Sequence, residues 1–331
     1  MATPLILDVD TGVDDALAIL YAVASPDVDL IACTSVMGNV TVERATTNTL
    51  AVLELAGHAD VEVAVGAERP LVQDHEPFPV VHGPDGLGNA DLPPPASAPS
   101  DRSAARAIVE LAAERPGEVV LVATGPLTNV AVALTDEPAL PALLRGFAIM
   151  GGAYDRSGNA TPAAEANIWV DPEAAAAVFR AFSGVPADSL PLCVGLDVTE
   201  DAMMTPAHLD EICAAAPSSA LARFLQESVP FYMDFYGRTR GFEGACMHDP
   251  LALAAAIEPT LCSWETTRVE IETDGRWTRG ETVTDRFGIR TSPWPVGWAQ
   301  EDNARVAFGL DRGRFTRVFV ERLRALVAST A

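Results

Sequence analysis

The chain has 331 residues, of which 49% are hydrophobic and 21% charged, and its formal net charge at pH 7 is −24. This composition is typical of a globular protein, and no uncharged apolar run approaches the roughly 18 residues of a membrane-spanning helix. The large negative charge argues against nucleic acid as a partner, because binding to phosphates depends on Lys and Arg.

From the N-terminus to about residue 200, short apolar runs alternate with helical patterns. Six runs are predicted to be strands: Leu5–Val9, Asp29–Val36, Val61–Val65, Val119–Ala123, Phe147–Met150 and Leu190–Leu196. Five segments between them are predicted to be helices: Ala16–Ala24, Val42–Leu55, Ala104–Ala113, Pro126–Leu134 and Pro172–Phe182. This alternation predicts an α/β fold with an open, mostly parallel, Rossmann-like sheet and helices on both faces.

The rest of the chain is less regular. We expect long loops at 67–99 and 151–171, a mainly helical segment at 206–256, an antiparallel strand pair at 264–271 and 281–286, and a final helix at 303–327. No linker separates these parts, so residues 1–331 are expected to form a single domain. Five cysteines without metal-ligand spacing favour buried free thiols, and the lack of a secretory signal favours a cytoplasmic location.

The first predicted strand leads into the stretch DVDTGVDDALAI, Asp8–Ile19, which contains four aspartates. A carboxylate at the start of the following helix can cap it, and Asp8 can be structural at the strand end. The remaining carboxylates would repel one another, and a divalent cation held by oxygens relieves such repulsion. Ligands of open α/β sheets lie beyond the carboxyl ends of the strands, so Asn39, Thr124 and Met150, which follow other strands, are expected beside this loop.

Two other acidic motifs share features with this stretch. An EF-hand loop needs Gly at its sixth position and Glu at its twelfth, but counted from Asp8 these are Val13 and Ile19, which excludes it. A phosphatase of the haloacid dehalogenase type also begins with Asp-x-Asp after a strand, although Gly12 departs from its pattern. A magnesium-dependent phosphatase using Asp8 and a non-catalytic nucleoside- or sugar-binding protein therefore remain as alternatives.

The stretch DVDTGVDDALAI resembles the N-terminal signature of the inosine-uridine preferring nucleoside hydrolases. Further blocks resemble that family in the same order: Gly38-Asn39, ATGPLTN at 123–129, MGGAYDRSGNATPAAEANIWVDPEAA at 150–175, and HDP at 248–250. The resemblance covers nearly the whole chain. It implies an enzyme that hydrolyses ribonucleosides to ribose and free nucleobase in nucleoside salvage, and that forms a homodimer or homotetramer.

The resemblance also implies a calcium ion as cofactor. Its ligands would be Asp10, Asp15, Asp249 and the main-chain carbonyl of Thr124, and the two adjacent hydroxyls of ribose would complete its coordination. Asp10 would act as the general base that activates a calcium-bound water. His248 would donate a proton to the departing base.

Substrate-binding residues follow from the same resemblance. The ribose hydroxyls would be held by Asp14, Asn39, Asn159, Glu165 and Asn167, with Met150 beside them. Tyr232 and Tyr236 lie four residues apart on one helical face and would contact the base, whereas Phe231 and Phe235 on the neighbouring stripe are explained by a core helix. His82, in the segment HGPDGLGN, would close over the base as a lid residue. The sequence leaves open whether purines or pyrimidines are preferred, and the aromatic residues favour tolerance of several bases.

Overall fold

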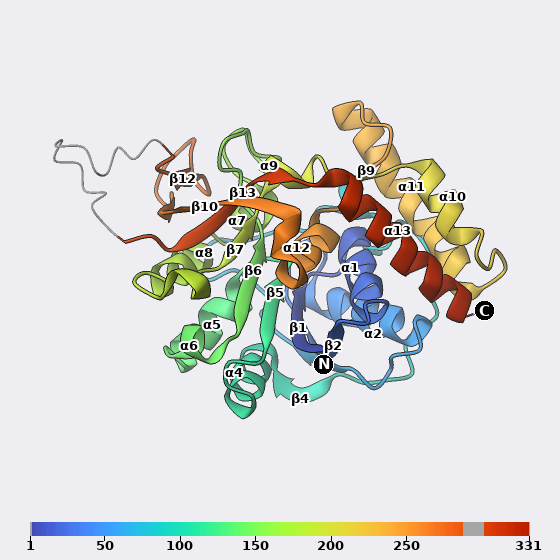
Figure 1. The fold of residues 1–331 in the computed structure, drawn as a ribbon, viewed down its shortest axis with the longest axis horizontal. Coiled ribbons are helices and arrows are strands. Elements are labelled where there is room, and N and C mark those ends of the chain that lie inside the picture. Colours follow the sequence, from blue (N-terminus) through green and yellow to red (C-terminus); the bar gives the residue numbers. More distant parts are fainter. Residues whose placement is uncertain (1, 287–300, 331) are drawn as a thin grey trace.

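The computed structural model describes residues 2–286 and 301–330. In this part of the chain the main sheet has nine strands: β1 (Thr3–Val9), β2 (Val28–Ser35), β3 (Glu62–Val65), β4 (Ser100–Ser103), β5 (Val120–Ala123), β6 (Gly146–Met150), β7 (Leu192–Val194), β10 (Cys262–Thr267) and β13 (Ala304–Leu310). Their order in space is β10-β13-β7-β6-β5-β1-β2-β3-β4 (Figure 1). Neighbouring strands are parallel apart from β10 and β13, so the open, mostly parallel sheet predicted from the sequence is confirmed.

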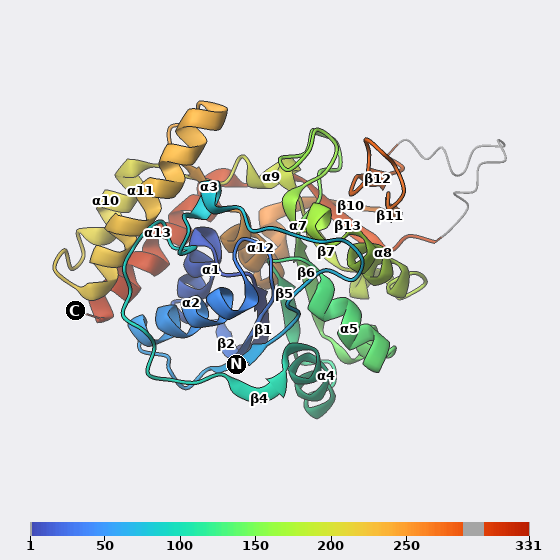
Figure 2. The ribbon, with the colours of Figure 1, turned by 180° about the vertical axis from the view of Figure 1, so that it is seen from behind.

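Helices cover both faces of this sheet (Figure 1, Figure 2). The longer ones are α1 (Val13–Val23), α2 (Val42–Leu55), α4 (Ala104–Glu114), α5 (Thr128–Asp136), α8 (Pro172–Ala181), α10 (Pro206–Cys213), α11 (Ala220–Arg240), α12 (His248–Ile257) and α13 (Arg312–Ser329). The short ones are α3 (Pro79–His82), α6 (Leu140–Leu143), α7 (Ala166–Val170) and α9 (Leu196–Thr199). Two small sheets pair β8 (Met203–Met204) with β9 (Ala245–Cys246), and β11 (Val269–Ile271) with β12 (Thr282–Thr284).

Alternate residues of the central strands enter two hydrophobic cores, one on each face of the sheet. Leu5, Leu7 and Val9 of β1 pack in the core that contains residues of α1, α2 and α10 to α13. Ile6 points the other way and packs in the core that contains residues of α4, α5 and α8. Because both faces are covered, the strands are apolar at nearly every position, as the sequence shows. Within the first core α1 packs directly against α12, which brings their N-terminal ends together.

Most of the predicted elements are present. The six strands and five helices expected before residue 200 are found with their ends displaced by a few residues, and α10, α11 and α12 fill residues 206–256. The two expected loops are largely irregular, but each contains a short helix, α3 or α7. Strand β4 was not expected, because Ser100–Ser103 is polar and forms a strand only through its pairing with Ala64 and Val65 of β3. All five cysteines are buried and free, as predicted.

The predicted final helix is wrong in its first part. Residues 304–310 form strand β13 between β7 and β10, and α13 begins at Arg312, where the Asp311 side chain caps it. Burial outweighs helical periodicity here, since Ala304 and Val306 complete the core of the sheet and Gly309 disfavours a helix. Because β13 pairs with β10, the predicted antiparallel pairing of residues 264–271 with 281–286 holds only for β11 and β12.

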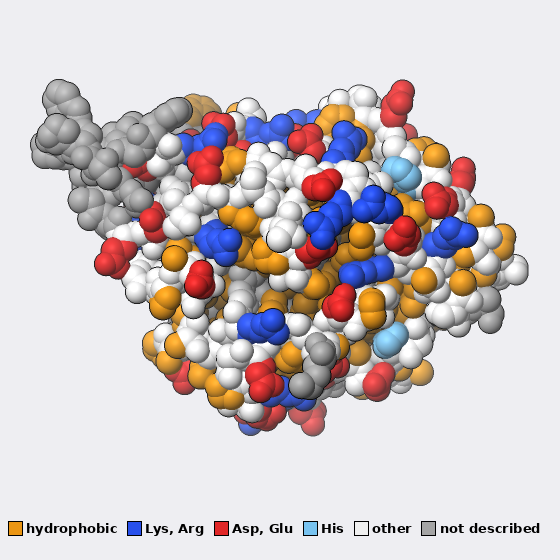
Figure 3. All heavy atoms as spheres, in the orientation of Figure 1, with side chains coloured by type: hydrophobic (Ala, Val, Ile, Leu, Met, Phe, Trp, Pro, Cys, Tyr) orange, Lys and Arg blue, Asp and Glu red, His pale blue; other side chains and the backbone are white. Residues whose placement is uncertain are grey.

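One face of the molecule is mixed in charge. On the face shown in Figure 3, arginine side chains stand among acidic ones and do not gather into one basic stripe. Over the whole chain, 46 acidic residues outnumber 22 basic ones, so basic side chains have acidic neighbours available. None of the described helices combines the length and the apolar character needed to cross a membrane.

Asn303 joins the last strand to its neighbours, and we expect its loss to destabilise the fold. Its side chain accepts from the Val269 N–H at 2.7 Å and donates to the carbonyls of Val269 and Phe179 at 2.9 and 3.0 Å, and it is fully buried. Asn303→Leu leaves these groups unpaired and should lower the free energy of unfolding by about 2–4 kcal/mol. Urea unfolding measures this, with Gln226→Leu on an exposed helical position as the control; equal stabilities would contradict the assignment.

Candidate active site

The carboxyl ends of β1 and β5 form the floor of the candidate site. The two strands are neighbours, yet the helices that follow them, α1 and α5, lie on opposite faces of the sheet. The loops that leave such strands diverge and open a crevice, which is the usual ligand position in this class of fold. Thr124, directly after β5, is bound to the first loop: its N–H donates to the Asp8 carbonyl and its hydroxyl to Asp15 Oδ1, both at 2.8 Å.

Three buried carboxylates meet at this crevice. Asp14 and Asp15 lie in the first turn of α1, and Asp249 lies in the first turn of α12. One oxygen of each lies within 4.8 Å of the others. Carboxylate oxygens grouped in this way are the ligands that a hard divalent cation prefers.

Asp10 is joined to this cluster through Asn39. Asp10 Oδ2 accepts from the Asn39 N–H at 2.7 Å and Oδ1 accepts from its Nδ2 at 3.1 Å, while the same Nδ2 lies 3.3 Å from Asp15 Oδ2. Gly38 makes this contact possible, because a Cβ at that position would stand 2.0 Å from Asp10 Oδ2. Asp10 is therefore held in a fixed orientation beneath the cluster.

Burial makes these carboxylates unfavourable as anions. It raises the pKa of Asp14 to about 7 and the pKa values of Asp10 and Asp249 well above their usual range, and the neighbouring aspartates add to the increase. Asp14 Oδ1 is buried without a hydrogen-bond partner in the described structure, and His82 Nδ1 lies 3.8 Å from it. A cation would offset both the repulsion and the unpartnered oxygen, so the residues present fit a divalent metal ion.

Asp8 has a structural environment. It is fully buried, its Oδ1 accepts from Thr34 Oγ1 at 2.5 Å and from Asn129 Nδ2 at 2.7 Å, and burial raises its pKa to about 7. It faces the core on the α5 side of the sheet and is not among the described residues of the cavity. The Asp10 carboxylate binds Asn39, which lines the cavity, whereas the Asp8 carboxylate binds Thr34 and Asn129, which are not among its described lining residues, so the phosphatase alternative is not supported.

A cavity of about 480 Å³ opens over the acidic cluster. Among the described residues, most of those predicted from the sequence line it: Asp14, Asn39, His82, Thr124, Met150, Asn159, Glu165, Asn167, Tyr232, Tyr236, His248 and Asp249. Asp10 and Asp15 do not line it, but they bind the lining residues Asn39 and Thr124 from below. The structure thus brings all the predicted site residues together.

Carboxylate and amide groups from residues 151–171 form one side of this cavity. Glu165 caps α7, and its oxygens accept from the N–H groups of Gly152, Asn167 and Ile168 at 2.9–3.1 Å. Asn167 Nδ2 donates to the carbonyl of Thr124 at 2.6 Å, and Asn159 Oδ1 accepts from the Ala166 N–H at 2.9 Å. This side can therefore exchange hydrogen bonds with a polyhydroxylated ligand.

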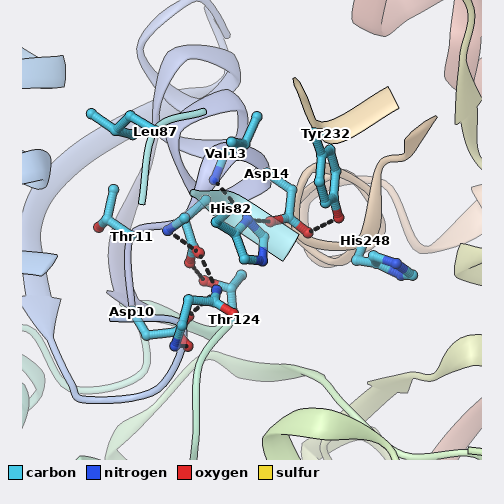
Figure 4. A network of polar contacts seen from close by, with 12 residues as sticks. Asp10, Thr11, Val13, Asp14, His82, Leu87, Thr124, Tyr232 and His248 are labelled. Carbon is cyan, nitrogen blue, oxygen red and sulfur yellow. Dashed lines mark hydrogen bonds and ion pairs between the residues drawn. The ribbon is translucent and has the colours of Figure 1, made fainter. Parts of the chain in front are cut away.

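Aromatic residues form the opposite side, as Figure 4 shows for Tyr232 and His82 beside Asp14. Tyr232 donates to Asp14 Oδ2 at 2.9 Å and stacks on the His82 ring with centroids 5.2 Å apart. His82 is buried, not solvent-exposed, and its Nδ1 accepts from the Val13 N–H at 3.1 Å. The Tyr236 hydroxyl lies 2.5 Å from His248 Nε2.

Both histidines are neutral at physiological pH. Burial lowers the pKa of His82 and of His248 to about 3, and the charge of Arg240 adds to the effect at His248. His248 Nδ1 is 2.7 Å from the Thr199 hydroxyl, so both of its ring nitrogens have partners. The protonated form of His248, which could donate a proton to a ligand, is therefore disfavoured. The neutral ring can still exchange hydrogen bonds.

Sequence reasoning missed several residues of the cavity wall, namely Phe78, Val80, Val81, Glu200, Phe235, Thr239 and Arg240. Phe235 packs against the hydrophobic core, as the sequence predicted, but it is only partly buried and also lines the cavity. Arg240 continues the four-residue spacing of Tyr232 and Tyr236, a signal that could have identified it. No sequence signal pointed to the residues at α3 or to Glu200 at the C-cap of α9, because only the fold brings those segments to the site.

The sequence and the fold were both compared with known proteins. Residues 5–317 match the family described as inosine-uridine preferring nucleoside hydrolase. The chain is similar to the pyrimidine-specific ribonucleoside hydrolase RihA of Salmonella arizonae, with 39% identity over 325 residues that cover 98% of this chain and 99% of that protein. It is also similar to the probable uridine nucleosidase 1 of Oryza sativa subsp. japonica, with 39% identity over 88% of each chain.

Solved structures agree with these matches. The plant nucleoside hydrolase PpNRh1 superposes with a TM-score of 0.90 at 33% identity, covering 98% of this chain and 100% of that one. The purine-preferring ribonucleoside hydrolase from Gardnerella vaginalis superposes with a TM-score of 0.89 at 34% identity, covering 98% and 99%. Both likenesses cover 98% of this chain.

The raised pKa values predict how stability depends on pH. Asp8 and Asp14 bind protons more tightly in the folded chain, where their pKa is about 7, than in the unfolded chain. Their stabilising contribution is present at low pH and is lost as the pH rises through about 7, so chelated protein should melt at a lower temperature at about pH 8 than at about pH 5. A divalent cation should restore more stability at the higher pH.

Thermal unfolding followed by circular dichroism, with and without a chelator, measures this dependence. Asp14→Asn is the matched variant and should reduce this dependence without abolishing it, because the amide does not ionise but Asp8 still does. A chelated wild-type protein that melts at the same temperature at both pH values would contradict the assignment.

Proposed function

Because the chain belongs to the inosine-uridine preferring nucleoside hydrolase family and hydrolyses the N-glycosidic bond of ribonucleosides, we propose that it uses calcium and a water molecule deprotonated by Asp10. The observation that carries this proposal is the floor of the cavity, where oxygens of Asp14, Asp15 and Asp249 lie within 4.8 Å of one another and Asn39 joins Asp10 to Asp15. In the overall reaction the water oxygen bonds to C1′ of ribose, and the electron pair of the broken bond goes to the base nitrogen. The free base gains the proton that the water loses.

The donor set supports calcium. Carboxylate and carbonyl oxygens suit a hard cation with a large and flexible coordination shell. We propose Asp10, Asp15, Asp249 and the Thr124 carbonyl as ligands; that carbonyl accepts one hydrogen bond from Asn167 and keeps a second lone pair. When bound, the cation neutralises the acidic cluster and acts as a Lewis acid toward oxygen ligands.

Asp10 is suited to act as general base. Its two oxygens are oriented by Asn39, and burial raises its pKa, which makes it a stronger base than an exposed aspartate. It lies under the cavity floor, on the side of the sugar opposite to the aromatic wall. Attack from this side with departure of the base toward the wall inverts the configuration at C1′, as in inverting glycosidases.

The amide and carboxylate side of the cavity would hold the ribose. Asn39, Asn159 and Asn167 offer donors and acceptors to hydroxyl groups, and Asp14 and Glu165 offer acceptors. Positive charge develops on the sugar ring as the bond to the base breaks, and buried carboxylates beneath the ring stabilise it. These residues therefore serve binding and catalysis together.

The aromatic wall would receive the base. Tyr232, Tyr236 and His82 can stack on it or bond its edges, and residues 79–82 would form the lid. Since His248 is neutral, we propose that it acts through its 2.5 Å contact with Tyr236, whose hydroxyl donates a hydrogen bond to the departing base. Tolerance of several bases fits this mixed wall, and relatives named for pyrimidines and for purines both share the fold.

The biological setting stays a prediction of the family resemblance. A ribonucleoside hydrolase would release bases and ribose for nucleoside salvage, would work in the cytoplasm and would assemble as a homodimer or homotetramer of residues 1–331. Size-exclusion chromatography with light scattering determines the assembly.

Replacing Asp10 tests the base assignment. Asp10→Asn keeps the shape of the side chain but cannot accept a proton from water, so kcat for uridine or inosine should fall by about 10²–10⁴-fold. Release of ribose by the purified enzyme gives the rate, and Asp60→Asn at an exposed position is the control. A near-normal kcat in Asp10→Asn would contradict the assignment of Asp10 as the general base.

Removal of metal tests the cofactor. Dialysis against a chelator should abolish cleavage of uridine and inosine, and calcium should restore it better than magnesium, because magnesium demands near-ideal octahedral geometry. Full activity in excess chelator, or recovery with magnesium alone, would show that the assignment of calcium is wrong.

A further inference from the structure

One face of helix α11 runs along the wall of the cavity. Tyr232, Tyr236 and Arg240 follow one another at intervals of four residues, and all three line the cavity. Tyr232 marks the sugar end, because its hydroxyl donates to Asp14 Oδ2 at 2.9 Å. A helix rises about 1.5 Å per residue, so the backbone of Arg240 is displaced by about 12 Å along the helix from that of Tyr232. Arg240 therefore stands at the end of the cavity remote from the acidic cluster.

Arg240 is held in place by charge and keeps its hydrogen-bond donors available. Its Nη2 lies 3.6 Å from Glu200 Oε1, which is close enough for attraction but too long for a hydrogen bond. Glu200 is itself bound by Arg156, whose Nη1 donates to Oε2 at 2.8 Å and to the Leu196 carbonyl at 2.7 Å. Among the described residues that line the cavity, Arg240 is the only Lys or Arg, and its side chain is 38% exposed.

The nucleobases differ in what they offer to a guanidinium group. Uracil and hypoxanthine carry a carbonyl oxygen on the edge away from the sugar, whereas cytosine and adenine carry an amino group there. The guanidinium has only donors, so it pairs with the oxygen and opposes the amino group. As the C1′–N bond breaks, its electron pair passes to the base nitrogen and part of the negative charge spreads to that oxygen. A donor at this position therefore gains strength in the transition state.

We propose, on the basis of the hydrolase function above, that Arg240 donates to the distal carbonyl oxygen of the base. The residue thereby selects ribonucleosides with oxo bases, such as uridine and inosine, over those with amino bases, such as cytidine and adenosine. Glu200, fixed by Arg156, positions the guanidinium. The floor of the cavity does not contribute to this selection, because every ribonucleoside presents the same ribose to it.

The experiment compares kcat/KM of the full-length, calcium-loaded enzyme for uridine, cytidine and the riboside of pyrimidin-2-one, which lacks the distal oxygen. Arg240→Gln should lower kcat/KM for uridine by about 10–100-fold and change the other two by less than about threefold. Arg240→Lys should give an intermediate loss, since it keeps the charge without the planar fork. Arg238→Gln is the matched control, because Arg238 pairs with Asp234 outside the cavity on the same helix and should leave all three substrates unaffected.

Equal losses for uridine and cytidine in both Arg240 variants, or no loss for uridine, would overturn the proposal. Cleavage of cytidine by the same Arg240→Gln preparation shows that the variant is folded. A wild-type enzyme that released ribose from none of the nucleosides would instead contradict the proposed mechanism of hydrolysis, and that outcome is visible before any variant is measured.

Discussion

Burial of carboxylates where the strand order of the sheet reverses is the constraint on which the rest of the site depends. Asp8, Asp10, Asp14, Asp15 and Asp249 are all nearly excluded from solvent, and burial raises the pKa of each. The protein offsets part of this cost with donors: Thr34 and Asn129 bind Asp8, Asn39 binds Asp10, and Thr124 and the Gly12 N–H bind Asp15. The ionised forms of Asp14 and Asp249, which face the cavity, depend most on a positive charge from outside the chain for their stability.

The same crowding explains the glycines of the sequence motifs. A Cβ at Gly38 would overlap Asp10, and a Cβ at Gly125 would stand 3.2 Å from the Asp10 side chain. A Cβ at Gly12 would lie 2.6 Å from His82 Nδ1, which is also the acceptor for the Val13 N–H. The glycines therefore bring three loops and the lid close enough to share one set of hydrogen bonds. In this site the motif residues are constrained by contact distance more than by turn geometry.

The sequence predicted the parallel sheet and the composition of the floor, because both leave local patterns. Apolar strands covered on two faces are recognisable individually, and the rule for strand ends places Asp14, Asn39 and Thr124 together. β13 could not be predicted in this way, since its seven residues also fit a helical periodicity, and it is burial together with pairing to β7 and β10 that makes them a strand. The burial of His82 could not be predicted from the sequence either, because it depends on Tyr232, which is far away along the chain.

The two ends of the cavity differ in how tightly the fold determines them. The floor is built by loops that leave neighbouring strands, and any displacement there would disturb several buried hydrogen bonds at once. The far wall is a single helical face, and at its last turn Arg240 lies 3.6 Å from Glu200, too far for a hydrogen bond. A substitution on this face would change the surface proposed to contact the base without moving the carboxylates proposed to act on the sugar. In the proposed mechanism, catalysis and base selection are therefore separable, and this chain is similar both to a hydrolase named for pyrimidines and to one named for purines.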